Sequence, residues 1–232
     1  GEVLPEDGSK FDIAYSLRAS TYRGQKQVSV QFEEFRVKEE KLVEVRESKI
    51  EIRDMRFDLS TFKRLNVQTL VWAEGSDKSK GKSRFELHQA DEFAIWTTPP
   101  SPVELRAALE IVKPKVVYVF AILPAEEKPD DFLNRLAGLC KYAINKRGGK
   151  ATLEELAVAM AAREAAVRLG VDWLGAGGHL QVQEEAGQFV LSAESGESNP
   201  YLQKELYIAL KGVLEETAAY RKYVAALNPL HF

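Results

Sequence analysis

The stretch from Ala94 to Phe120 constrains the fold of this chain more than any other. It holds a short apolar run, a Thr-Thr-Pro-Pro turn, helical periodicity from Ser101 to Val112, and an unbroken apolar run over residues 116–122. Ser101 can cap the helix, because proline follows it and Glu104 stands at capping-box spacing. A continuous apolar strand is typical of a parallel sheet covered on both faces. The stretch therefore predicts a right-handed strand–helix–strand unit.

Further strands are predicted before this unit. Residues 49–55 alternate apolar and polar side chains, and residues 68–73 form a second short apolar run. Residues 60–65 can form a short helix, and residues 74–84 have the composition of a loop rich in glycine and lysine. We expect residues 49–127 to form a small α/β layer with four mostly parallel strands.

A β-hairpin is predicted near the N-terminus. Residues 11–19 and 27–35 alternate around a glycine-containing turn, and we expect Val28, Val30 and Phe32 to point inward. Two strands alone are marginally stable, so the hairpin must pack on something else or belong to a larger barrel. The charge-dense residues 36–47 are typical of a linker.

Three helices are predicted after residue 128. Residues 130–146 carry one apolar stripe. Thr152 and Glu155 form a capping box before a short helix, and residues 163–169 form a third helix that we expect to end at Gly170.

Two short strands and a long helix complete the chain. Residues 179–183 and 188–192 predict a second hairpin, and Asn199-Pro200 starts a helix that runs to about residue 226. Three helices followed by a hairpin is the order of a winged helix.

Composition excludes several classes of protein. The 232 residues carry a formal net charge of -3. This charge argues against a surface that is basic throughout and binds nucleic acid, but it is compatible with a local basic patch. The single cysteine, Cys140, excludes an internal disulfide, and we expect it in the core. An intracellular, cytoplasmic location is consistent with this, because no signal peptide or membrane-length apolar run of ~18 residues is present.

Familiar catalytic and cofactor motifs are missing from the sequence. It has no GxGxxG, Walker or GxSxG motif. Proline follows two of the predicted strands and offers no N–H group to a phosphate. No two histidines share a ligand spacing, and His179, after Gly177-Gly178, is best explained by a tight turn. We therefore predict no catalytic residue, metal or cofactor site in this chain.

Three sets of residues are candidates for contact with nucleic acid. Each has a simpler alternative: a solvated loop, inward-facing aromatics, or a winged helix that binds protein. The candidates are Lys78, Lys80, Lys82 and Arg84 in the loop, Arg18, Tyr22, Arg23 and Lys26 in the first hairpin, and Arg163 and Arg168 in the third helix.

Three segments together carry a resemblance to a known family. Residues 11–36, with Ser20-Thr21-Tyr22-Arg23-Gly24 at the turn, look like the end of an OB domain. Residues 96–120, with Pro99-Pro100-Ser101 and Lys113-Pro114, look like a stretch of the family's added α/β domain. Residues 130–220 are similar to the family's trailing helices and wing. In this order they resemble the C-terminal region of RecJ, the single-stranded-DNA-specific exonuclease of the DHH family.

The resemblance implies an α/β chain in a multidomain α+β arrangement. Its expected parts are a partial OB-like hairpin with linker (1–48), a Rossmann-like layer (49–127), a winged-helix-like module (128–196) and a C-terminal helix (197–232).

The resemblance also implies a role in DNA recombination and repair. The parent enzyme would degrade single-stranded DNA from 5′ to 3′ with Mn²⁺ or Mg²⁺, but no Asp-His-His motif is present here, so this chain would be inactive alone. It would guide DNA or dock a partner such as single-strand-binding protein or a helicase. The alternatives are a stand-alone protein adaptor, and a small-molecule sensor with a winged-helix output.

Overall fold

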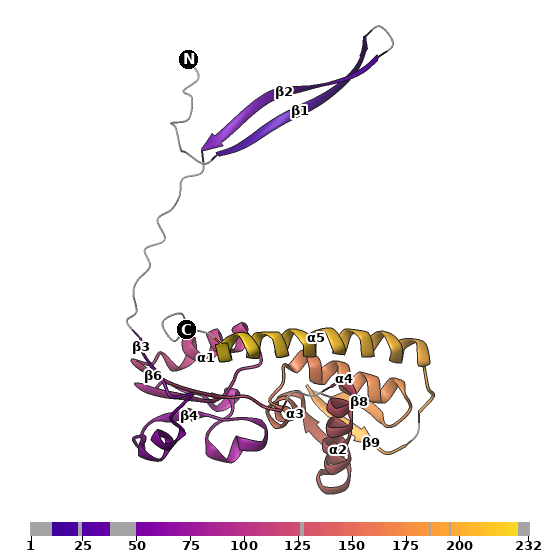
Figure 1. The fold of residues 1–232 in the computed structure, drawn as a ribbon. Coiled ribbons are helices and arrows are strands. Elements are labelled where there is room, and N and C mark those ends of the chain that lie inside the picture. The colour runs from indigo at the N-terminus through magenta and orange to yellow at the C-terminus, as the bar shows by residue number, and fades with distance from the viewer. Residues whose placement is uncertain are drawn as a thin grey trace. The chain divides into compact units, whose positions relative to one another are not determined.

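The computed structural model describes residues 11–22, 25–37, 50–125, 128–185, 187–194 and 196–226 (Figure 1). The fold is mixed α/β, as the sequence predicts. Its contacts divide the chain into two compact units, Gly1–Ser48 and Lys49–Phe232. Within the described ranges, no helix is both long and apolar enough to cross a membrane.

The first unit contains the predicted hairpin. Strands β1 (Phe11–Tyr22) and β2 (Gln25–Val37) pair antiparallel, with Tyr15 opposite Phe32. The expectation that Val28, Val30 and Phe32 point inward is wrong in this structure, because they are 67%, 67% and 51% exposed. The alternation is real, but it produces an apolar face that lies open to solvent.

A four-stranded parallel sheet forms the first part of the second unit. Its strands stand in the order β3-β6-β5-β4, and every neighbouring pair is parallel. This confirms the predicted layer. The strands are β3 (Glu51–Asp54), β4 (Leu70–Trp72), β5 (Glu92–Thr97) and β6 (Val116–Ile122).

Different elements cover the two faces of this sheet. Helix α1 (Pro102–Val112) covers one face with Ala108 and Val112, and its predicted cap is present, since the Ser101 side chain accepts a hydrogen bond from the Val103 N–H at 3.1 Å. The 3-10 helix η1 (Leu59–Arg64) lies on the other face, where Phe62 packs against Trp96 with ring centroids 4.4 Å apart.

The predicted loop after β4 is more ordered than its composition suggests. It contains the 3-10 helices η2 (Gly75–Lys80) and η3 (Arg84–Glu86). Between them, the Lys82 N–H donates to the Val71 carbonyl at 2.8 Å, so the segment pairs with the edge of β4. A Cβ at Gly81 would lie 2.3 Å from the Val71 oxygen. The glycine therefore permits the close approach that covers this edge of the sheet.

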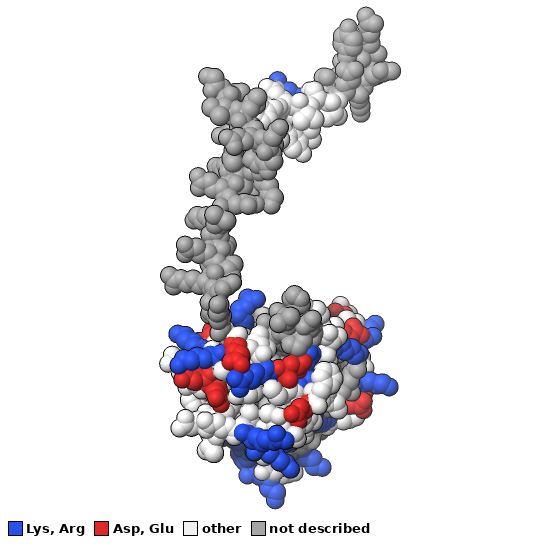
Figure 2. All heavy atoms as spheres, turned by 60° about the vertical axis from the view of Figure 1, so that its left-hand side comes forward, with Lys and Arg blue, Asp and Glu red and all other residues white. Residues whose placement is uncertain are grey.

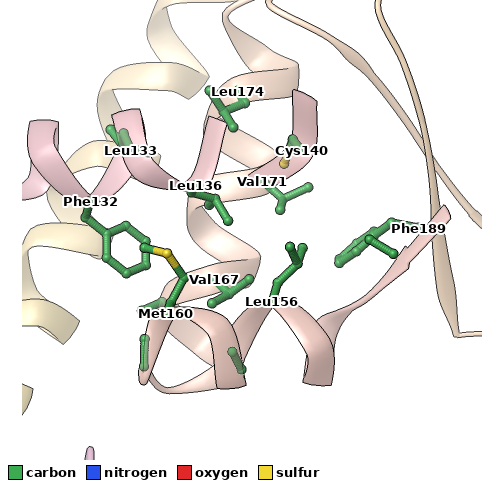
Figure 3. Close-up of a cluster of buried hydrophobic side chains, with 14 of the residues drawn as sticks. Phe132, Leu133, Leu136, Cys140, Leu156, Met160, Val167, Val171, Leu174 and Phe189 are labelled. Atoms are coloured by element: carbon green, nitrogen blue, oxygen red, sulfur yellow. The ribbon is translucent and has the colours of Figure 1, made fainter. Parts of the chain in front are cut away.

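Four helices and a small antiparallel sheet form the rest of the second unit. Their apolar side chains converge on one core that includes Cys140 (Figure 3). The sheet order is β7-β9-β8. The elements are α2 (Pro129–Arg147), β7 (Lys150–Thr152), α3 (Leu153–Met160), α4 (Glu164–Ala176), β8 (Gln181–Glu185), β9 (Gln188–Ser192) and α5 (Pro200–Ala226).

Helix α4 corrects one prediction. The sequence predicts that this helix ends at Gly170, but it continues through Gly170 to Ala176. A Cβ at Gly170 would lie 2.5 Å from Cδ2 of Leu136 and 3.3 Å from the Phe132 ring. The glycine is present because α2 and α4 pack closely at this point, and it does not end the helix.

Helix α5 joins the two parts of the second unit. Leu210 lies in the helical core, and Val224 lies in the core between α1 and the sheet. Arg56, which follows β3, donates to the Val224 and Ala225 carbonyls at 2.9 and 3.1 Å. The predicted boundaries at residues 127 and 196 therefore fall inside one compact unit.

Candidate nucleic-acid and partner interface

The lysines of the segment after β4 differ in their surroundings. Lys78 is exposed and has no ion pair among the described residues. Lys80 pairs with Asp77 at 2.5 Å and lies over the Trp96 ring, 4.5 Å from its centroid. Lys82 is 3.6 Å from Glu86. Of these three lysines, Lys78 is the most available to a phosphate or a carboxylate.

Arg84 belongs to a buried network. Its Nε donates to Glu74 at 2.9 Å, and the same carboxylate accepts the Arg84 backbone N–H at 3.0 Å and the Trp72 indole N–H at 2.9 Å. The side chains of Arg84 and Glu74 are 9% and 2% exposed. This guanidinium therefore holds the segment in place and does not face solvent as a phosphate ligand would.

The two arginines predicted on the third helix are both engaged. Arg163, the N-cap residue of α4, pairs with Glu216 of α5 at 2.8 Å. Arg168 makes a two-pronged contact with Glu184 of β8 at 2.7 and 3.1 Å and lies over the Phe189 ring. The contact with Glu184 raises the pKa of Arg168. Both cations tie α4 to neighbouring elements.

The candidate residues of the hairpin are only partly visible. Arg18 lies in β1 and is exposed. Tyr22 and Lys26 lie in β1 and β2, but the structure describes only their backbone, and Arg23 lies outside the described residues. Their role in contacting nucleic acid stays a prediction.

A groove separates the segment after β4 from the helices. Its volume is about 690 Å³. One wall is residues 78–86, and the other is formed by α2 and α3. Phe85 and Tyr142, which are 43% and 60% exposed, line opposite walls. The groove thus offers two exposed aromatic rings among apolar and charged lining residues.

Charged side chains of both signs line this groove. Lys82 faces its own partner Glu86, and Arg147 makes a two-pronged ion pair with Glu155 at 2.7 and 3.1 Å. The hydrogen bond from Arg147 lowers the pKa of Glu155, which also completes the capping box of α3 with Thr152. These pairs lie within each wall and do not close the groove.

The contribution of α2 to this groove is not predicted from the sequence. Its last turn carries Lys146 and Arg147, and Tyr142 stands one turn earlier on the same face. The available signal was the run of cations at a helix end, which also suits the helix dipole. In Figure 2, the lower end of the second unit carries Lys and Arg without Asp or Glu. In Figure 1, α2 extends to this lower end.

A second cavity lies at the carboxyl ends of the parallel strands, where α/β proteins often bind ligands. Its volume is about 380 Å³, and Glu74, Asp77, Thr97 and Arg135 are among its lining residues. Glu74 is held by Arg84, and hydrogen bonds from Lys80 and the Trp96 indole lower the pKa of Asp77. Because two carboxylates with protein partners line this cavity, it is unfavourable for phosphate binding.

The remaining single candidates have structural roles. The His179 ring stacks on Trp173 with centroids 5.7 Å apart, after a turn in which Gly178 has a φ of 69°. Burial raises the pKa of the Cys140 thiol to about 11, so it is a weak nucleophile. Across the described ranges, no group of three or more His, Cys, Asp or Glu side chains is arranged to hold a metal ion.

Comparisons with protein-family models, with curated proteins and with solved structures find no match.

Proposed function

We propose that this chain is a non-catalytic C-terminal region of a RecJ-like 5′→3′ single-stranded-DNA exonuclease. The order of the three resembling segments carries this proposal. The Pro99-Pro100-Ser101 stretch lies between β5 and α1, and Lys113-Pro114 lies between α1 and β6. These are the turns that the resemblance would require of an α/β layer.

The same proposal assigns each part of the fold to an expected domain of the parent enzyme. The hairpin would be the end of an OB-like domain, and the parallel sheet would be a Rossmann-like layer without a nucleotide site. Helices α2, α3 and α4 with strands β7, β8 and β9 would be a winged-helix-like module closed by α5. The metal-dependent chemistry, with Mn²⁺ or Mg²⁺, would belong to the catalytic core of the parent enzyme.

The role of this region would be to guide single-stranded DNA or to dock a partner in recombination and repair. Lys78 and Arg18 are exposed cations that support contact with DNA. The partner would be single-strand-binding protein or a helicase, and the setting would be cytoplasmic.

A stand-alone adaptor that binds protein and no DNA is the second candidate. Two observations favour it: the net charge of -3, and the ion pairs that engage Lys80, Arg163 and Arg168. Such pairs would have to open before these side chains could contact phosphate.

Salt dependence separates the two candidates. The fluorescence anisotropy of a labelled single-stranded oligonucleotide is measured with the purified chain at low and high salt. A guiding region binds at low salt and loses affinity steeply as salt rises, because phosphate contacts release counterions. The Lys78→Ala variant then weakens binding and lowers the slope by about one unit. Absence of binding at low salt would favour the adaptor.

A further inference from the structure

A small cavity lies beside α5, where the parallel sheet meets the helical part of the second unit. Its volume is about 100 Å³, and its lining comes from the residues that follow β6, from α2, from the end of α3 and from α5. The carboxyl ends of parallel strands are where α/β proteins often bind ligands. An apolar cavity of ~150 Å³ holds a benzene molecule, so this cavity suits an organic ligand with few carbon atoms.

Buried side chains form the apolar part of the lining. Phe132 of α2 and Met160 of α3 are 1% and 3% exposed, and they lie next to each other in Figure 3. Leu214 contributes from α5. An apolar group that enters this part of the cavity leaves water, which favours its binding.

The polar side chains that line the same cavity can all donate hydrogen bonds. They are three cations and one hydroxyl, from Arg135, Arg221, Lys222 and Thr217. No Asp or Glu is among the described residues of this lining. Glu74 and Asp77 line the neighbouring cavity, where they pair with Arg84 and Lys80. A set of positively charged donors without a carboxylate is suited to an anion.

The end of α3 fixes two of these cations in position. Arg135 donates to the Ala159 carbonyl at 2.7 Å, and Arg221 donates to the Ala161 carbonyl. Cations suit this end of the helix because its last carbonyls carry partial negative charge. A guanidinium carries several N–H donors in a planar fork, so it can hold a helix carbonyl and a ligand carboxylate at the same time.

Thr217 gives an independent indication of a ligand. The residue is 7% exposed and lines the cavity from α5, and no hydrogen bond engages its hydroxyl among the described residues. Buried hydroxyl groups normally have a hydrogen-bond partner. An oxygen atom of a ligand in the cavity supplies one.

We propose that this cavity binds a small organic carboxylate with a short apolar chain. The chain packs against Phe132, Met160 and Leu214, and the carboxylate accepts hydrogen bonds from Arg135 and Thr217. A ligand placed there connects the end of β6 with α5. The inference goes beyond the proposed function and does not rest on it, because it requires neither DNA nor a partner protein.

The two methionines of the chain provide a direct test. Met160 lines the cavity, whereas Met55 packs in the cluster on the η1 face of the sheet. The chain is isotopically labelled at its methionine methyl groups and titrated with isovalerate, and NMR follows both methyl signals, which Met55→Leu assigns. The Met160 signal shifts until it saturates, and the Met55 signal stays in place. Isovaleramide, which has the same shape without the charge, binds at least about tenfold more weakly.

Matched variants test the donors. Thr217→Val keeps the shape of the side chain, and it weakens isovalerate binding roughly twofold to tenfold because the hydroxyl is lost. Arg135→Gln weakens it by about tenfold or more, because a charged donor is lost. Lys204→Gln, at an exposed cation of α5 outside the cavity lining, leaves the affinity unchanged. The unfolding midpoint of each variant, measured by circular dichroism, separates lost binding from lost folding.

Three results would overturn the proposal. The Met160 signal could show no saturable shift at any soluble concentration of isovalerate, or the amide could bind as tightly as the acid. Alternatively, folded Thr217→Val and Arg135→Gln could both bind isovalerate as well as the unchanged chain does. The oligonucleotide measurement that tests the proposed function is separate, so failure of one proposal is distinguishable from failure of the other.

Discussion

At the scale of single residues, the contact between α2 and α4 depends on the absence of one side chain. Gly170 lies against Leu136, which is fully buried and has little room to move. We expect Gly170→Ala to destabilise the fold by about 1–3 kcal/mol through overpacking, although alanine is the better helix former. Chemical unfolding followed by circular dichroism measures this change.

Gly138 of α2 provides the matched control. It is exposed, and a Cβ there meets no atom within 4 Å. Gly138→Ala should therefore stabilise the protein by about 0.5–1 kcal/mol, because only the helix propensity changes. If both substitutions stabilise the protein alike, the close approach of α2 and α4 at Gly170 is contradicted.

Residue-level prediction from sequence succeeds where the cause is local. The caps at Ser101 and Thr152 depend on neighbours two or three residues away, Val103 and Glu155, and both are present in the structure. Gly170 depends on Leu136, which lies on another helix, so its spacing suggested a helix end. The sequence predicts Arg84 to be a surface cation, because no local pattern shows that Glu74 is buried beside it.

The Arg84–Glu74 pair gives a second test at this scale. Arg84→Met leaves a buried carboxylate without its partner, and we expect a loss of roughly 3–5 kcal/mol in the free energy of unfolding. The double variant Arg84→Met with Glu74→Gln should recover part of this loss. Lys115→Ala, which breaks the exposed pair with Asp91, should change stability little. Equal losses from Arg84→Met and Lys115→Ala would refute the structural role.

At the scale of elements, the end of α5 is fixed by the Asp54–Arg56 pair. Arg56 contacts Asp54 at 2.9 Å and donates to the last carbonyls of α5, where a cation also suits the helix dipole. The hydrogen bond from Arg56 lowers the pKa of Asp54. The stabilisation from this carboxylate is therefore complete above its unfolded-state pKa near 4 and is lost as pH falls through the lower folded-state pKa.

Asp54→Asn should consequently show a pH-dependent effect. At pH 7 we expect it to lower the free energy of unfolding by about 1–3 kcal/mol, since hydrogen bonds to a charged group are lost. Below the folded-state pKa the variant and the unchanged protein should converge. Urea unfolding at neutral and acidic pH measures the difference, and an equal loss at both would contradict the assignment.

Among its described residues, the hairpin exposes large apolar side chains on one face. Leu17 and Val30 stand opposite each other on the apolar face and are 63% and 67% exposed. We expect Leu17→Thr with Val30→Thr to reduce concentration-dependent self-association, which sedimentation velocity measures. Ser29→Thr with Gln31→Thr, on the opposite face, is the control. Self-association that persists equally in both variants would show that another surface causes it.

At the scale of the whole molecule, the kinds of element could be predicted from the sequence, whereas the packing between them depends on contacts of residues far apart in the chain. The parallel layer, the helices and the second hairpin all follow from local periodicity. The joining of the sheet and helices in one unit depends on α5, which contacts both cores through Leu210 and Val224. The walls of the groove come from segments about sixty residues apart in the chain, so local patterns do not predict it. The sequence predicts Lys78 and Lys82 on one wall as candidate contact residues, but it does not predict Tyr142 and Arg147 on the other wall.

We propose that this chain binds DNA or a partner protein and has no nuclease chemistry of its own. A 5′-labelled single-stranded oligonucleotide is incubated with the purified chain and Mn²⁺ or Mg²⁺, and its length is followed on a denaturing gel. We expect the oligonucleotide to keep its full length at every time point with either metal. Metal-dependent shortening that disappears when a carboxylate of this chain is replaced would contradict it.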